Sequence, residues 1–334
     1  MTLSGNRDRA WQGLTAFSDV FTCYSSAIAA WLAFEAERWP ELLNPGLWLT
    51  VTEAGDGLFA FGHLQPGLRS ALGLERRGAD EGPHAVVGVR EELDRSGRAI
   101  IAGDGFNLPW HVAFQRRHVP HWFVLASADD GFEFVDPFSC RNEFGWQQPS
   151  RAPVSEETLT DLLAALAQDD PVFRLRESYA FGDEAAAPGS RRFQWFVASA
   201  VANGRTPTGD RGVAAVGRLA RHFRDHGQQP DAYRQADDIW SIARHRAFFA
   251  RLVDRDATLE GTGELRVWLE EHIAPLALKW SHAAPLIMQA TLTLGAGRPA
   301  SSSLPELLDE LAERELAAAS TVPGSGRQLL AGRV

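Results

Sequence analysis

Apolar and polar residues alternate most clearly between His121 and Phe138, and this stretch predicts a β-hairpin. Residues 121–126 are aromatic, aliphatic or β-branched, and residues 132–135 form a second run with apolar alternation. The Asp129-Asp130-Gly131 sequence between the runs is typical of a tight turn, and Asp136-Pro137 ends the second run. We therefore expect two antiparallel strands joined by a short loop.

The register of this hairpin decides whether His121 and Asp136 share a face, because side chains alternate between the two faces of a strand. With a two-residue loop at Asp129-Asp130, position 128 pairs with 131 and position 123 with 136. His121 and Asp136 then lie on one face as diagonal neighbours, roughly 7–8 Å apart at the backbone. A three-residue loop would put them on opposite faces. A carboxylate beside an imidazole fixes its tautomer and stabilises its charged form.

An apolar helix is predicted from about Cys23 to Glu37, with Thr22 or Asp19 as its N-cap. A thiol in the first turn of a helix feels the positive end of the helix dipole, which favours the nucleophilic thiolate. The competing interpretation is that Cys23 is a small buried core residue, which is the usual position of a free cysteine.

Taken together, Cys23, His121 and Asp136 follow one another in the order of a papain-type catalytic arrangement. In such a site the thiolate attacks an acyl carbon, the histidine moves the proton and the carboxylate orients the histidine. Three functions stay open at this point. They are a cysteine acyltransferase, a cysteine peptidase or amidase of the same fold, and a binding module without catalysis.

Between the helix and the hairpin, residues 99–110 begin as a buried strand that breaks at Gly103-Asp104-Gly105. Glycine on both sides of Asp104 indicates a tight turn or a close backbone approach. Asp104 is accordingly either a carboxylate that caps this turn or a residue of the site. His111 and His118, which follow, are interpreted as surface residues.

The pattern changes after the hairpin, and it predicts an α+β protein with two domains and a tail. Residues 1–150 would form the catalytic domain, an antiparallel sheet packed on the cysteine-bearing helix, and residues 142–153 would be a linker at its end. From Ser155 the apolar spacing is helical, including residues 193–202. A helical domain is thus predicted over 151–320, followed by a disordered tail over 321–334.

Composition excludes several classes of protein. The 334 residues contain two cysteines and no CxxC sequence, so neither a disulfide framework nor a zinc site is expected. The net charge of −10 argues against a nucleic-acid surface. No apolar run reaches the roughly 18 residues of a membrane span, and no signal peptide is recognised, so we expect a cytoplasmic protein without membrane contact.

The segment from Ala102 to Phe138 also resembles a known family. Asp104, Leu108-Pro109-Trp110, His121 and Val135-Asp136-Pro137 follow in the order found in the N-terminal domain of the butirosin biosynthesis protein H family. Those domains are papain-like and are similar to C39-type peptidase domains. The Cys23 helix fits the same pattern, and the C-terminal half resembles the helical domain of that family around residues 244–246 and Trp280.

The resemblance implies acyl transfer in antibiotic and related natural-product biosynthesis. Family members move an acyl or aminoacyl group from the phosphopantetheine thioester of an acyl carrier protein to an amine. The implied catalytic residues are Cys23, His121 and Asp136, with no bound cofactor and no metal. C39-type enzymes carry a glutamine before the cysteine as oxyanion donor, whereas this chain has Phe17, Ser18 and Asp19 there. The oxyanion donor is therefore left open, with the Cys23 backbone N–H as the first candidate and Ser18 or Asn107 as further candidates.

Further site residues follow from the same interpretation. Substrate binding is expected from Ser18, Asp104, Asn107 and Trp110. Because carrier proteins are acidic and this chain is acidic too, docking needs a local basic patch, for which Arg116 and Arg117 are the candidates together with Arg76-Arg77; a solvated loop face is the alternative. The helical half would either shape the pocket for the small-molecule amine acceptor or form the face of a homodimer.

Overall fold

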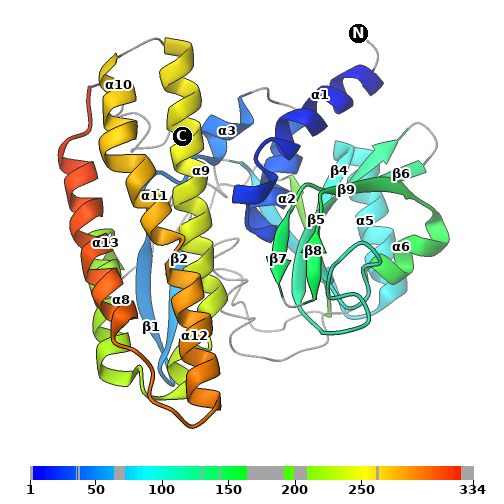
Figure 1. The fold of residues 1–334 in the computed structure, drawn as a ribbon. Coiled ribbons are helices and arrows are strands. Elements are labelled where there is room, and N and C mark those ends of the chain that lie inside the picture. Colours follow the sequence, from blue (N-terminus) through cyan, green and yellow to red (C-terminus); the bar gives the residue numbers. More distant parts are fainter. Residues whose placement is uncertain are drawn as a thin grey trace. The chain divides into compact units, whose positions relative to one another are not determined.

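A computed structural model describes residues 3–34, 36, 38–63, 72–128, 131–142, 144–163, 192–198, 209–260 and 263–324. The chain forms two compact units, each assembled from separate stretches of sequence. The first unit comprises residues 1–43, 67–173 and 184–204, and the second comprises residues 44–66, 174–183 and 205–334. Helices and antiparallel sheets occur together, so the α+β class predicted from the sequence is confirmed (Figure 1).

The first unit is built on a six-stranded antiparallel sheet with the strand order β3-β10-β4-β5-β6-β9. The central strands β4 and β5 consist almost entirely of buried residues, because both faces of these strands are covered. The strands are β3 (Leu74–Ala79), β4 (Arg98–Asp104), β5 (Pro120–Ala128), β6 (Gly131–Asp136), β9 (Ser150–Val154) and β10 (Phe193–Ala198), with a separate pair β7 (Cys140–Asn142) and β8 (Gly145–Gln147).

Helices cover the two faces of this sheet. On one face, Ile101, Phe123 and Leu125 share a core with α5 (Gly82–Ser96) and α6 (Glu156–Leu162). On the other face, Trp122 meets Tyr24 of α2 (Cys23–Ala33) edge to face, with ring centroids 6.2 Å apart. Among the described residues, this unit also contains α1 (Leu3–Thr15), the short 3₁₀ turn η1 (Ser18–Val20) and α3 (Trp39–Leu43).

The second unit combines a small sheet with a helical bundle. Its buried ion pair joins Arg246 Nε to Glu315 Oε1 at 2.7 Å, and the Trp280 indole donates to the same oxygen at 3.0 Å. These three residues tie α9, α11 and α13 together. The elements are β1 (Thr50–Gly55), β2 (Leu58–Gly62), β11 (Asp210–Arg211), α8 (Val213–His226), η3 (Pro230–Tyr233), α9 (Ala236–Glu260), α10 (Gly263–Trp268), η4 (Leu269–Ile273), α11 (Ala274–Trp280), α12 (Ala283–Gly295) and α13 (Ser303–Ser320).

Two sequence-based boundaries need correction. The division at residue 150 would cut through the sheet, because β9 begins at Ser150 and pairs with β6, and residues 44–66 belong to the second unit. The segment 193–202, predicted as helix, begins with β10, which pairs with both β3 and β4; residues 199–202 lie outside the described part. Pairing on both sides favours an aromatic and β-branched run as strand whatever its isolated preference.

The structure also shows where the Cys23 helix ends and how the predicted tail begins. The helix at Cys23 ends at Ala33, four residues earlier than expected. Of the predicted tail, residues 321–324 follow α13 outside any helix or strand, and residues 325–334 lie outside the described part of the chain. Across the described residues, none of the helices combines the length and the apolar character needed to cross a bilayer.

Candidate active site

The thiol of Cys23 lies at the first residue of α2, at a helix start defined by hydrogen bonds. Thr22 is the N-cap, and its side chain accepts from the Ser25 amide at 3.2 Å while Ser25 Oγ accepts from the Thr22 amide at 2.8 Å. This reciprocal capping box fixes where the helix begins. Cys23 is half-buried and lies at the positive end of the helix dipole, which favours an anionic side chain there.

His121 and Asp136 meet as the hairpin register predicts. Ala128 pairs with Gly131 and Val124 with Val135, so the diagonal relation of His121 and Asp136 is confirmed. His121 Nε2 lies 2.7 Å from Asp136 Oδ2. Only 1% of the His121 side chain and none of the Asp136 side chain is exposed, so this hydrogen bond is shielded from water and acts at a low local dielectric constant.

Donors surround the carboxylate of Asp136 on several sides. Besides His121, Oδ2 accepts from the Trp110 indole at 2.9 Å and from the Gln147 amide at 3.2 Å, and Oδ1 accepts from the Phe138 backbone at 3.2 Å. An ionised carboxylate only accepts hydrogen bonds, and each of these groups donates one. The arrangement therefore holds a buried negative charge in a fixed orientation toward His121.

The charge of His121 follows from its surroundings. Burial lowers the pKa of His121, but the Asp136 carboxylate and the Cys23 side chain more than offset this effect and raise the pKa to about 10. The Cys23 side chain contributes through a hydrogen bond and through its charge. Because Asp136 occupies Nε2, the nitrogen left for the sulfur is Nδ1. At neutral pH the histidine is thus an imidazolium between the Asp136 carboxylate and the sulfur of Cys23.

Two polar residues of the site were missed by the sequence analysis. Gln147, which the sequence placed in a linker, is 1% exposed, and besides bonding Asp136 it accepts from the Val112 amide at 3.3 Å. His111, interpreted as a surface residue, is buried and its ring centroid lies 4.4 Å from that of His121. Neither position has a signal in the sequence, because each is buried by contacts with residues that are not its neighbours in the chain.

Replacing Gln147 by Leu is expected to lower the free energy of unfolding by about 1–3 kcal/mol, because the Val112 amide and the Asp136 carboxylate each lose a buried partner. Urea titration measures this change. The matched control is Gln148→Leu, since Gln148 is the exposed neighbour. Equal effects of the two substitutions would show that the buried amide does not support the carboxylate.

Four residues were expected to bind substrate, and their positions differ. Asp104 turns its oxygens inward, because Oδ1 accepts from the Phe106 and Val119 amides and Oδ2 lies 2.6 Å from His118 Nδ1. Asp104 therefore caps this turn, as one of its two interpretations expects.

The other three residues expected to bind substrate make different contacts. Trp110 donates to Asp136 and stacks on Phe134. The Asn107 amide closes a turn onto the Asp104 carbonyl at 2.8 Å. Ser18 lies in η1, where its carbonyl accepts from the Ser139 amide at 3.2 Å. The Trp110 side chain thus lies at the Asp136 carboxylate, whereas these contacts of Asn107 and Ser18 are made by their backbone atoms.

The two basic spots are separated within the first unit. Arg116 and Arg117 are exposed on the loop between β4 and β5, where Arg116 donates to the Phe144 carbonyl at 2.6 Å. Arg76 and Arg77 lie on β3, which is two strands away from β4 in the direction opposite to β5. Arg77 also forms an ion pair with Glu75 at 3.2 Å. The expected single patch is therefore reduced to the Arg116-Arg117 loop.

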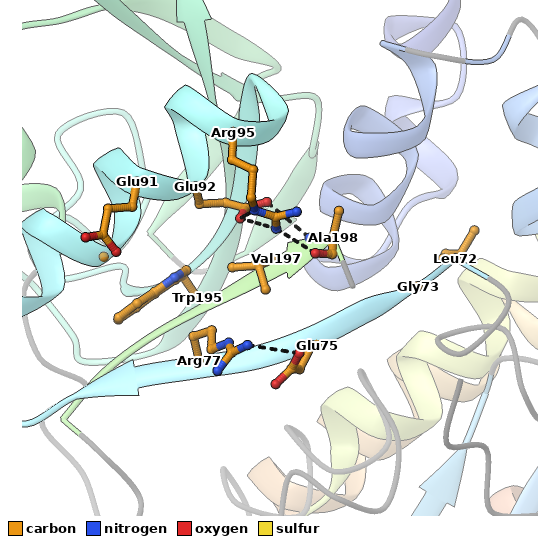
Figure 2. A pocket seen from close by; sticks show the side chains of 11 residues that line it. Leu72, Gly73, Glu75, Arg77, Glu91, Glu92, Arg95, Trp195, Val197 and Ala198 are labelled. Carbon is orange, nitrogen blue, oxygen red and sulfur yellow. Dashed lines mark hydrogen bonds and ion pairs between the residues drawn. The ribbon is translucent and has the colours of Figure 1, made fainter. Parts of the chain in front are cut away.

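A hollow of about 740 Å³ lies elsewhere on this unit, between α5 and the strands β10 and β3 (Figure 2). Figure 2 shows Glu92 and Arg95 directed toward the end of β10, where Arg95 donates to the Ala198 carbonyl at 2.6 Å. Glu92 also accepts from Arg95 Nε at 3.0 Å. The buried Glu92 carboxylate is thus already paired with Arg95. None of Cys23, His121 and Asp136 lines the hollow, so the hollow is not part of the candidate site.

No group of three or more histidine, cysteine, aspartate or glutamate side chains suited to a metal ion occurs within the described ranges. Neither a scan against protein-family models nor a search of curated proteins finds a match to this chain. The assignment of the site therefore depends on its own geometry, namely a thiol at a helix start, an imidazole and a fully buried carboxylate.

Proposed function

We propose that this chain is a cysteine-dependent acyltransferase that moves an acyl or aminoacyl group from the phosphopantetheine thioester of a carrier protein to an amine in natural-product biosynthesis. The observation that carries the proposal is the buried His121–Asp136 hydrogen bond of 2.7 Å, together with the Cys23 side chain, whose hydrogen bond and charge raise the pKa of His121. The order and the geometry of these groups are those of a thiolate–imidazolium pair with an orienting carboxylate. We also propose a papain-like fold for the first unit.

In the first step, the Cys23 thiolate attacks the carbonyl carbon of the thioester. The bond from that carbon to the phosphopantetheine sulfur breaks, and the leaving thiolate takes the Nδ1 proton of the His121 imidazolium. The product is an acyl group on Cys23 beside a neutral histidine. Exchange between two thioesters is nearly balanced in free energy, so positioning and proton transfer are what the protein has to supply.

In the second step, the amine attacks the acyl carbon and His121 Nδ1 takes its proton. The bond to Cys23 Sγ breaks, an amide is released, and the thiolate–imidazolium pair is restored. The Cys23 amide is the proposed oxyanion donor, since it lies at the helix start before the first intrahelical bond, which the Ser26 amide makes to the Thr22 carbonyl.

The carrier protein would dock on the Arg116-Arg117 loop. Both side chains are exposed, and their loop follows β4 and leads directly into the strand that carries His121. Their positive charge complements an acidic carrier domain and would guide its approach at low salt. A small-molecule amine is then the acceptor.

Incubation with an acylated carrier protein is expected to add the mass of the acyl group to the chain, located on Cys23 by peptide mass spectrometry. Cys23→Ala should abolish the adduct, and Cys140→Ala, which removes the other cysteine, should leave it unchanged. Addition of an amine should then discharge the adduct as an amide.

The same experiment separates the competing functions. Discharge by water at the same rate with and without amines would make the chain a hydrolase, and failure of Cys23 to accept any acyl group would remove the transferase proposal.

A further inference from the structure

His111 is held in a loop whose backbone is fixed by successive turns. The His111 amide donates to the Leu108 carbonyl at 2.9 Å, and the His111 carbonyl accepts from the Phe114 amide at 2.9 Å. The loop is closed at its base, where the Gly105 amide donates to the Val119 carbonyl at 2.8 Å. These hydrogen bonds fix the loop backbone and therefore the position of His111.

The tautomer of His111 follows from one hydrogen bond. The Ala113 amide donates to His111 Nδ1 at 3.1 Å. Nδ1 must then present its lone pair, so the ring is neutral and carries its proton on Nε2. Burial, together with the positive charge of His121, lowers the pKa of His111 to about 2, in agreement with this tautomer.

Close packing presses this ring against His121. The planes of the two rings are inclined at 61° with centroids 4.4 Å apart. A Cβ atom at Gly105 would lie 2.6 Å from His111 Nδ1, so only glycine leaves room for the ring there. The neutral imidazole consequently fills the space between the loop and the charged histidine.

We propose that His111 is a positioning residue, whose uncharged ring holds the His121 ring against Asp136 and Cys23 while its Nδ1 anchors the loop through the Ala113 amide. This inference rests on the proposed function, because it assigns a further residue of the same site. A phenylalanine would supply only the ring that packs against His121, and an asparagine only the acceptor for the Ala113 amide. Histidine supplies both.

The two roles are separated by His111→Phe and His111→Asn in a Cys140→Ala background, where Cys23 is the remaining thiol. The site is read by the iodoacetamide rate of Cys23 and by the NMR signal of the ring proton that His121 shares with Asp136. Stability is read by the melting temperature. We expect the two variants to rank oppositely in these two kinds of measurement.

Specifically, His111→Phe should retain the proton signal and most of the alkylation rate but melt at lower temperature. His111→Asn should melt closer to the unchanged protein but lose the proton signal and react about tenfold more slowly, as expected for a loosened catalytic group. If the site measurements instead follow the melting temperatures, or stay unchanged in both variants, His111 does not position His121.

A measurement on the unsubstituted chain tests the tautomer independently. With ¹⁵N-labelled histidine, the His111 nitrogen shifts should be those of a neutral ring protonated on Nε2 through the neutral pH range. A charged ring or the opposite tautomer would overturn the inference. Both NMR measurements are independent of acyl transfer, so a failure of the proposed function leaves this inference testable.

Discussion

The His121→Ala variant is expected to transfer the acyl group about 10³-fold more slowly than the unsubstituted chain, since the proton donor of the first step and the base of the second are both lost. Alkylation of Cys23 at pH 7 should fall about 30-fold as well, because a thiol without an imidazolium partner is only a few per cent thiolate at this pH. Quenched-flow mass spectrometry of the acyl adduct measures the first effect, and iodoacetamide kinetics measure the second.

The matched control is His84→Ala, because the side chain of His84 is 75% exposed on α5 and pairs with the similarly exposed Glu81, the residue before that helix. It should behave as the unsubstituted chain in both assays. Retention of Cys23 reactivity within about threefold in His121→Ala would mean that the thiolate does not depend on the imidazole, and the proposed pair would be wrong.

Removal of the carboxylate is the second large effect. Asp136→Ala is expected to lower the free energy of unfolding by about 3–5 kcal/mol, because it leaves the buried His121 charge without its partner. It also removes the acceptor of the Trp110 indole and of the Gln147 amide. Asp136→Asn retains the size and one acceptor oxygen, so its loss should be smaller. Urea unfolding followed by tryptophan fluorescence measures both variants.

This pair also predicts a pH dependence of stability. The pKa of His121 is raised on folding from 6.5 to about 10, so the folded chain binds this proton more tightly than the unfolded chain. The resulting stabilisation is complete below pH 6.5 and is lost as the pH rises toward 10. The unsubstituted chain should therefore lose more stability over this interval than Asp136→Asn does. Equal losses would contradict the raised pKa.

Local patterns were sufficient to predict the centre of the site. The period-2 alternation of the hairpin and its two-residue loop fix the register, and the register alone places His121 diagonally to Asp136. The Thr22 cap likewise follows from the sequence before the helix. Both predictions depend on residues close together in the chain.

What the sequence did not predict depends on contacts between distant segments. β10 pairs with β3 and β4, which lie about 90 to 120 residues earlier, so its strand state is decided by partners that the local pattern cannot indicate. Gln147 is buried because its amide bridges Asp136 and the Val112 amide. His111 is buried by the loop that Asp104 holds together.

The central claim is that Cys23 is a thiolate paired with His121, and the most direct test is the iodoacetamide rate of each cysteine as a function of pH, measured by peptide mass spectrometry. Cys140 is the internal reference, because both thiols are half-buried. Cys23 should react at least about 30-fold faster than Cys140 at pH 6 to 7, where an ordinary thiol is mostly protonated, and the difference should vanish in urea. If both thiols instead follow one slow curve that rises only toward the pH of an ordinary thiol, the thiolate–imidazolium pair does not exist.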